Sequence, residues 1–311
     1  MKKIVTWVKE FVKEDFHLLS YLWFACFMLG CFIYNYEVNF EDDVLDPHQG
    51  SIEGILFFFL FYAFAWFGTS IPKVAWNNKK LFSNSSYWIK SSFILLVLAT
   101  ASGMKIDWRS LFPDITSFEF YTLRKVLNYA MNVSIVFGGS ALIYSFYKDK
   151  STRLYGFTAK NFNLKPYLGL LALMFPLLLW ASFQPSFLEQ YPNYRPWNYT
   201  SDSQQQLLGT IAYLTSYALD FIEVEFLFRG LLVIGVAQVI GKEAILPMVA
   251  VYAFLHFGKP MPEALGSIFG GYILGVISYR GQSILGGIIV HVGIAFLMEL
   301  LASIQHLFLM S

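Results

Sequence analysis

Charged residues are scarce in this chain. Only 14% of its 311 residues are Asp, Glu, Lys or Arg, whereas soluble domains carry about 25%. The formal net charge is +1, so the strongly basic surface of a nucleic-acid-binding protein is missing and we expect no nucleic acid partner. Cysteine is almost absent as well. Cys26 and Cys31 lie on different faces of one expected helix, so we expect no disulfide between them.

Long apolar runs take the place of charge. Hydrophobic residues make up 56% of the chain and aromatic residues 19%. A spanning helix needs about 20 mostly apolar residues. We therefore expect an all-α, polytopic membrane helix bundle of about eight or nine transmembrane helices. The expected spans are 17–36, 54–72, 86–104, 126–147, 167–184, 207–239, 245–258, 264–279 and 284–305. The stretch 207–239 is long for one crossing, and we expect it to be strongly tilted or broken near Gly230 and Gly235.

Four segments divide the chain. Residues 1–16 place apolar side chains on one helical face and lysines on the other, which is typical of an interfacial amphipathic helix. They contain no apolar run of the kind a cleavable signal peptide has. We expect a four-span membrane part over 17–147, a cytoplasmic linker over 148–166, and a membrane core over 167–311.

The loop charges predict the orientation. Lys and Arg are concentrated in loops on the N-terminal side of the membrane, whereas the acidic loop 37–50 contains neither. By the positive-inside rule the N-terminus is cytoplasmic. We expect an integral protein of a prokaryotic inner membrane, with the lipid bilayer as its surroundings.

The core carries ionisable residues at bilayer depth. Residues 220–230 read DFIEVEFLFRG, and His256 and His291 follow in later apolar segments. Such groups are costly in a membrane and usually face a protein interior or a water-filled cavity. Glu225 and Arg229 are four residues apart and can pair. They could be a neutralising structural pair, and each histidine could be a hydrogen-bonding strut between helices. Together these residues are also the usual equipment for activating water and stabilising an oxyanion.

Glycines recur in the core. The run GSIFGGYILG spaces Gly266 from Gly270, and Gly271 from Gly275, by four residues. This spacing lets helix backbones approach closely. We expect the spans that carry the polar residues to pack tightly.

This pattern resembles the CAAX protease and bacteriocin-processing family, also called the CPBP or Abi family, which includes type II CAAX prenyl endopeptidases. The matching motifs are Glu225-Phe-Leu-Phe-Arg229 followed by Gly230, Tyr252-x-x-x-His256, and His291. The resemblance covers about residues 150–311. It implies an intramembrane endopeptidase that needs no cofactor and no metal, with Glu225, His256 and His291 in the catalytic site and Arg229 as a structural partner.

Two positions depart from the family pattern. The resemblance places the water-activating glutamate at Val224, and the oxyanion-holding Asn or Asp at Ala295. Glu223 is a candidate substitute base, but on a helix it points about 100° away from Val224. Asp220 lies about 6 Å along the axis from that position. Glu299 lies two turns beyond His291.

Three functions follow from these observations. The first is a pseudoprotease that acts as a partner or assembly subunit of a membrane complex, with other membrane proteins as its partners. The second is a divergent intramembrane endopeptidase that uses Glu225 or Glu223 as the base. The third is a small-molecule transporter, although the sequence shows no inverted repeat. A metal-dependent variant would use Glu225, His256 and His291 as ligands.

Overall fold

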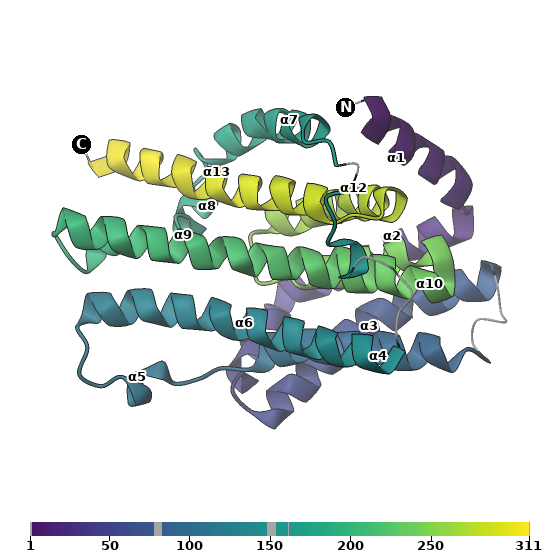
Figure 1. Ribbon diagram of the computed structural model, residues 1–311, viewed down its shortest axis with the longest axis horizontal. Helices are drawn as coiled ribbons and strands as arrows, with labels where there is room; N and C mark the ends of the chain where they lie inside the picture. The colour runs from purple at the N-terminus through teal and green to yellow at the C-terminus, as the bar shows by residue number, and fades with distance from the viewer. Residues whose placement is uncertain (1, 78–82, 148–153, 161, 311) are drawn as a thin grey trace.

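The computed structural model describes residues 2–77, 83–147, 154–160 and 162–310, and the regular elements in these ranges are all helical. Its long helices lie side by side along the longest axis of the molecule (Figure 1). The first part contains α1 (Lys2–Asp15), α2 (Leu18–Val38), the π-helix η1 (Phe40–Leu45), η2 (Asp46–His48), α3 (Ile52–Asn77), α4 (Ser85–Gly103), α5 (Trp108–Leu111) and α6 (Ser117–Tyr147).

The second part continues the bundle. It contains η4 (Leu154–Gly156), α7 (Lys165–Ala181), α8 (Pro185–Gln190), η5 (Pro196–Asn198), α9 (Ser203–Glu225), the π-helix η6 (Phe226–Gly235), α10 (Val236–Ile240), η7 (Gly241–Ala244), α11 (Ile245–Phe254), α12 (Met261–Gly281) and α13 (Leu285–Met310).

The polytopic membrane bundle expected from the sequence is confirmed. Within the described ranges, six helices are long and apolar enough to cross a membrane: Leu18–Val38, Ile52–Trp76, Ser117–Phe146, Ser203–Phe254, Met261–Gly281 and Leu285–Phe308. The 52-residue run Ser203–Phe254 contains the expected span 207–239 and most of the expected span 245–258. The expected spans 86–104 and 167–184 are helical as α4 and α7 but are not among the six. The number of eight or nine therefore stays a prediction.

The helix across Gly230 and Gly235 changes its winding instead of breaking. The chain runs directly from α9 into the π-helix η6. Tyr155 lies against both glycines: an added Cβ would be 3.0 Å from the Tyr155 carbonyl oxygen at Gly230, and 3.2 Å from the Tyr155 ring at Gly235. The two glycines therefore allow a close approach of another segment. Insertions of π-helix are frequent at functional sites.

The segment that touches these glycines belongs to the expected linker 148–166, of which residues 148–153 and 161 lie outside the described residues. Tyr155 is only 2% exposed, and Gly156 accepts a hydrogen bond on its carbonyl oxygen from the Ile284 backbone N–H at 2.9 Å. Gly156 has a φ of +87°, and a Cβ there would collide with Ile234. Tyr155 and Gly156 of the linker are thus packed between η6 and the start of α13.

The N-terminal helix α1 packs on protein. Phe11 is fully buried, and its ring lies 6.1 Å from Tyr272 and 6.0 Å from Tyr279 of α12. At the end of α1, Asp15 accepts a hydrogen bond from Lys73 of α3 at 2.7 Å. Part of the apolar face of α1 thus packs on α12, and a buried ion pair joins its C-terminal end to α3. The interfacial position of the helix stays a prediction.

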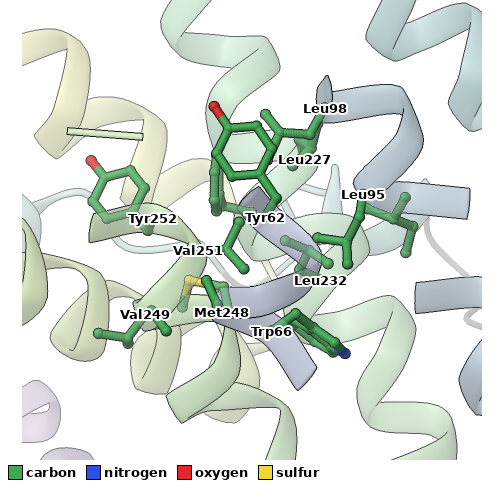
Figure 2. Packing of buried hydrophobic residues seen from close by; sticks show 14 of the residues in the cluster. Tyr62, Trp66, Leu95, Leu98, Leu227, Leu232, Met248, Val249, Val251 and Tyr252 are labelled. Carbon is green, nitrogen blue, oxygen red and sulfur yellow. The ribbon is translucent and has the colours of Figure 1, made fainter. Parts of the chain in front are cut away.

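One apolar cluster joins the two membrane parts. It contains residues from α3, α4, η6 and α11, among them Tyr62, Trp66, Leu95, Leu98, Leu227, Leu232, Met248 and Val251 (Figure 2). Lys90 of α4 is buried in this region and donates a hydrogen bond from Nζ to the Gly235 carbonyl oxygen at 2.8 Å. The N-terminal helices thus support the winding of η6, which carries the candidate site.

Candidate active site

A buried ion pair lies where α9 passes into η6. An Arg229 guanidinium nitrogen is 2.9 Å from Oε1 of Glu225, and both side chains are fully buried. The contact follows from their spacing of four residues. A carboxylate and a guanidinium in a low-dielectric interior each offset the large cost of burying the other.

His291 of α13 contacts the same carboxylate oxygen. Its Nδ1 lies 2.9 Å from Oε1 of Glu225. One turn earlier on α13, a Cβ added to Gly287 would overlap with Oε2 of Glu225. Only glycine therefore lets α13 approach the carboxylate closely enough for His291 to reach it.

Tyr252 of α11 connects the two histidines. Its hydroxyl oxygen is 3.3 Å from Nε2 of His291. Nδ1 of His256, in the turn after α11, donates a hydrogen bond to the Tyr252 carbonyl oxygen at 2.8 Å. The Arg229 guanidinium carbon lies 4.3 Å from the centre of the Tyr252 ring, which is cation–π geometry. Glu225 thus contacts both Arg229 and His291 directly, whereas His256 joins them through Tyr252.

The helices that carry these residues pack through only some of the expected glycines. A Cβ at Gly271 would be 3.0 Å from the Tyr252 ring, and one at Gly275 would be 2.6 Å from the Met248 side chain. Gly266 and Gly270 have no such neighbour within 4 Å. Close packing of α12 on α11 therefore uses the second glycine pair, which fixes the position of Tyr252.

The two positions that depart from the family motif lie in apolar surroundings. Val224 packs against the main apolar cluster. Ala295 is 3% exposed and belongs to a cluster with Tyr194, Tyr213 and Tyr217. Aromatic rings therefore occupy the space around the position where the resemblance places an oxyanion-holding Asn or Asp.

A row of aromatic rings on α9 extends to His291, and it was not predicted from the sequence. Tyr213, Tyr217 and Phe221 are four residues apart, with ring centroids separated by 5.2 and 4.7 Å. The Phe221 ring is 4.4 Å from the His291 ring. The four-residue spacing of these aromatics was the available signal, because it places them on the helix face that also carries Glu225.

The carboxylates considered as substitute bases have other surroundings. Glu223 is 5% exposed, and its Oε2 has no hydrogen-bond partner among the described residues. Asp220 accepts a hydrogen bond from Asn132 of α6 at 3.4 Å, and Glu299 accepts one from the Asn193 backbone at 2.9 Å. Within the part of the chain that the structure describes, no hydrogen bond joins these carboxylates to either histidine.

The residues of the metal-dependent alternative do not form a metal-binding group. Across the described ranges, no three side chains of His, Cys, Asp or Glu converge in a way that could hold an ion. Oε1 of Glu225 already contacts both Arg229 and His291. The donor set therefore does not fit a zinc centre, in which neutral imidazoles and a carboxylate converge on one point.

Residues 206–297 match the family model described as type II CAAX prenyl endopeptidase Rce1-like. The matched segment contains Glu225, Arg229, His256 and His291, the residues on which the resemblance rests. This part of the chain belongs to the CAAX protease family. No curated protein and no solved structure matches the chain.

The hydrogen bonds of this CAAX protease segment define one arrangement of protons. If Nδ1–H of His291 donates to the Glu225 carboxylate, Nε2 of the neutral imidazole accepts the hydroxyl hydrogen of Tyr252. The charges of Arg229 and Glu225 then cancel. Both nitrogens of His291 are engaged by protein groups, and the polar contacts join α9, η6, α11 and α13. Oε2 of Glu225 and Nε and Nη2 of Arg229 are buried without a hydrogen-bond partner among the described residues.

Proposed function

We propose that this chain is a non-catalytic member of the CAAX protease family that acts as a partner or assembly subunit of a membrane complex. The observation that carries the proposal is Val224, which stands where the resemblance places the water-activating glutamate. A valine side chain has no group that accepts a proton or holds a water molecule by hydrogen bonds.

The contacts of the family-motif residues that the chain retains support the proposal. Glu225 is engaged by Arg229 and His291, and His291 is also contacted by Tyr252. Ala295 has no polar side-chain atom to hold an oxyanion, and it packs in a cluster with Tyr194, Tyr213 and Tyr217. The polar residues that remain therefore hold one another, which suits a structural role in a membrane scaffold.

The expected loss of rate is large. A general base usually contributes about 100- to 10,000-fold, and an oxyanion donor about 100- to 1,000-fold. The two losses are not additive in general. Even the smaller of them would reduce an intramembrane protease to a small fraction of its rate.

The first experiment restores the missing carboxylate. Membranes from cells that express the parent, Val224→Glu, or Val224→Glu with Ala295→Asn are compared for new peptide termini by mass spectrometry. We expect the parent to match cells without the chain and at least one restored variant to produce new termini. The single variant is needed because Asn at 295 would enter the tyrosine cluster and could disturb packing.

The second experiment tests the scaffold role directly. His256→Ala is the most selective change, because among the described residues the His256 ring makes a hydrogen bond only to the backbone carbonyl of Tyr252, and Glu225 keeps its partners. We expect this variant to restore the cellular phenotype of a deletion strain as well as the parent does. Loss of that restoration at unchanged protein level, together with loss of parent-dependent peptide termini, would contradict the proposal.

That contrary outcome would favour a divergent intramembrane endopeptidase. The match to an endopeptidase family over residues 206–297 is the observation that supports this second candidate. In that mechanism His256 would polarise water, with Glu225 or Glu223 as the base and His291 on the oxyanion. Glu225→Gln should then remove the parent-dependent termini.

We also propose the orientation that the loop charges predict, with the N-terminus in the cytoplasm of a prokaryotic cell and the acidic loop 37–50 outside. A cysteine introduced at Asp43, which is exposed, should react with an impermeant maleimide added to intact cells. Labelling only after the membrane is opened would reverse the assignment.

A further inference from the structure

An apolar hollow lies apart from the polar site. It has a volume of about 620 Å³ and is formed by α2, η1, α3 and the end of α11. Its walls are almost entirely aliphatic and aromatic. The lining includes Gly30, Phe40, Val44, Phe61, Phe254 and Phe257. Neither Glu225, Arg229 nor His291 lines it. Its volume lies within the range of about 300–1,000 Å³ that is common for small-molecule sites.

Gly30 leaves the wall of this hollow open. The residue lies in α2, and a Cβ added to it would have no neighbour within 4 Å. On the opposite side, Phe254 and Phe257 are 2% and 3% exposed and their ring centroids are 4.6 Å apart. These two rings flank His256 in the sequence, so a molecule in the hollow would rest on the turn that carries a candidate site histidine.

Acidic residues lie in the turn at one end of the hollow, between two of its lining residues. The π-helix η1 follows α2 and supplies Phe40 and Val44 to the lining, while Glu41, Asp42 and Asp43 belong to the same turn. Asp42 and Asp43 are both exposed. The loop 37–50 contains no Lys or Arg. Lys259 attracts the carboxyl group of Glu41, and Lys105 attracts that of Asp46. The acidic residues of the loop outnumber these two lysines.

The apolar hollow and the acidic turn follow one another along the chain as the tail and head group of an amphiphile do. α2 is long and apolar enough to cross the membrane and ends at Val38, and the acidic turn begins at Phe40. The apolar walls are therefore at the depth of lipid chains, and the carboxylates are at the end of a span, where head groups lie. An ammonium group would be attracted there, whereas an anionic head group would be repelled.

We propose that this hollow binds the alkyl chain of a single-chain, cationic amphiphile from the membrane. The chain lies against Phe61, Phe254 and Phe257, and the ammonium group lies at Asp42 and Asp43. Burial of the chain beside aromatic rings supplies binding, and the acidic turn selects the head group. This inference does not depend on whether the polar site cleaves peptide bonds.

The test uses three photoreactive probes with one chain length and different head groups: hexadecylamine, hexadecanol and hexadecanoate, each with a diazirine in the chain. The full-length protein in lipid nanodiscs is irradiated with each probe, and the labelled peptides are identified by mass spectrometry. We expect the amine to label peptides of α2, α3 and the end of α11 about tenfold more than the anion, a ratio that corresponds to about 1.4 kcal/mol.

Matched variants separate the hollow from general contact with lipid. Gly30→Phe should fill the hollow and abolish selective labelling. Gly138→Phe is the control, because Gly138 is also an exposed glycine of a spanning helix with no neighbour within 4 Å, and it does not line the hollow. The double change Asp42→Asn and Asp43→Asn should equalise the amine and the anion while leaving labelling by hexadecanol unchanged.

Several outcomes would overturn the proposal. Equal labelling by the three probes in the parent would mean contact with bulk lipid only. Labelling of Gly30→Phe at the level of the parent would place the probe elsewhere on the surface. Retained preference for the amine after both aspartates are changed would assign the head group to other residues. If Gly30→Phe is unstable, Gly30→Leu, which fills less of the space, replaces it in the same comparison.

Discussion

Removal of the Arg229 guanidinium is the most direct perturbation of the buried centre. In Arg229→Ala, Glu225 loses the cation 2.9 Å away but stays fully buried. Breaking a buried ion pair by removing one partner usually costs about 3–5 kcal/mol, because the other charge is left uncompensated. The lost contact with the Tyr252 ring adds to this cost. We therefore expect Arg229→Ala to lose a large part of the stability of the folded chain, which is typically about 5–15 kcal/mol.

The chain provides a matched control in a second arginine–glutamate pair. Arg280 and Glu14 form an ion pair whose side chains are 25% and 55% exposed. Water and salt screen exposed pairs, so Arg280→Ala should change stability little. Both variants are measured by the loss of structure with increasing denaturant in the same detergent, and the free energies of unfolding are compared with that of the parent.

A double variant tests the cause of the loss. Arg229→Met combined with Glu225→Gln removes both charges, so it should be more stable than Arg229→Met alone. If Arg229→Ala and Arg280→Ala are equally stable, Glu225 is not left as an uncompensated buried charge and the reasoning is refuted. If the double variant is less stable than the single one, the uncompensated charge of Glu225 is not the cause of the lost stability.

Two further predictions concern the acidic turn and the helix contact at the site. Burial, together with the charge of Asp46, raises the pKa of Glu41 to about 8. The folded state then keeps a proton that the unfolded chain loses near pH 4–5, so stability should fall between about pH 5 and pH 8 by at most about 1.4 kcal/mol per pH unit. Glu41→Gln should flatten this dependence in thermal unfolding curves; an unchanged slope would contradict it. Gly287→Ala should lower the unfolding temperature, whereas Gly138→Ala should not, because only the first Cβ meets the Glu225 carboxylate.

Local patterns predicted the elements of the site well. Apolar runs indicated the spanning helices, because a bilayer leaves few alternatives for satisfying backbone hydrogen bonds. The spacing of Glu225 and Arg229 predicted their contact, which the structure has at 2.9 Å. The ordered motifs predicted a CAAX protease relationship, which is confirmed over residues 206–297. The catalytic and structural roles assigned to these residues stay predictions.

Contacts between distant segments could not be predicted. The π-winding of η6 depends on Tyr155 packing against Gly230 and Gly235, and on Lys90 reaching the Gly235 carbonyl oxygen. The need for glycine at position 287 depends on how closely α13 approaches α9. Each contact joins residues far apart in the sequence, and the residue types alone do not indicate their partners.

The structure also explains how a valine can stand at position 224 without disturbing its neighbours. The network runs from Arg229 through Glu225 and His291 to Tyr252 and includes no group from residue 224. Within this network one cation and one anion already balance. A second carboxylate nearby would add a desolvation cost and would repel Glu225 unless it held a proton. Valine avoids both costs, so the polar network can persist as a link between helices without the group that would activate water. Stability and catalysis would therefore be separable in this centre, and a carboxylate restored at position 224 should be able to raise activity only at some cost in the free energy of unfolding.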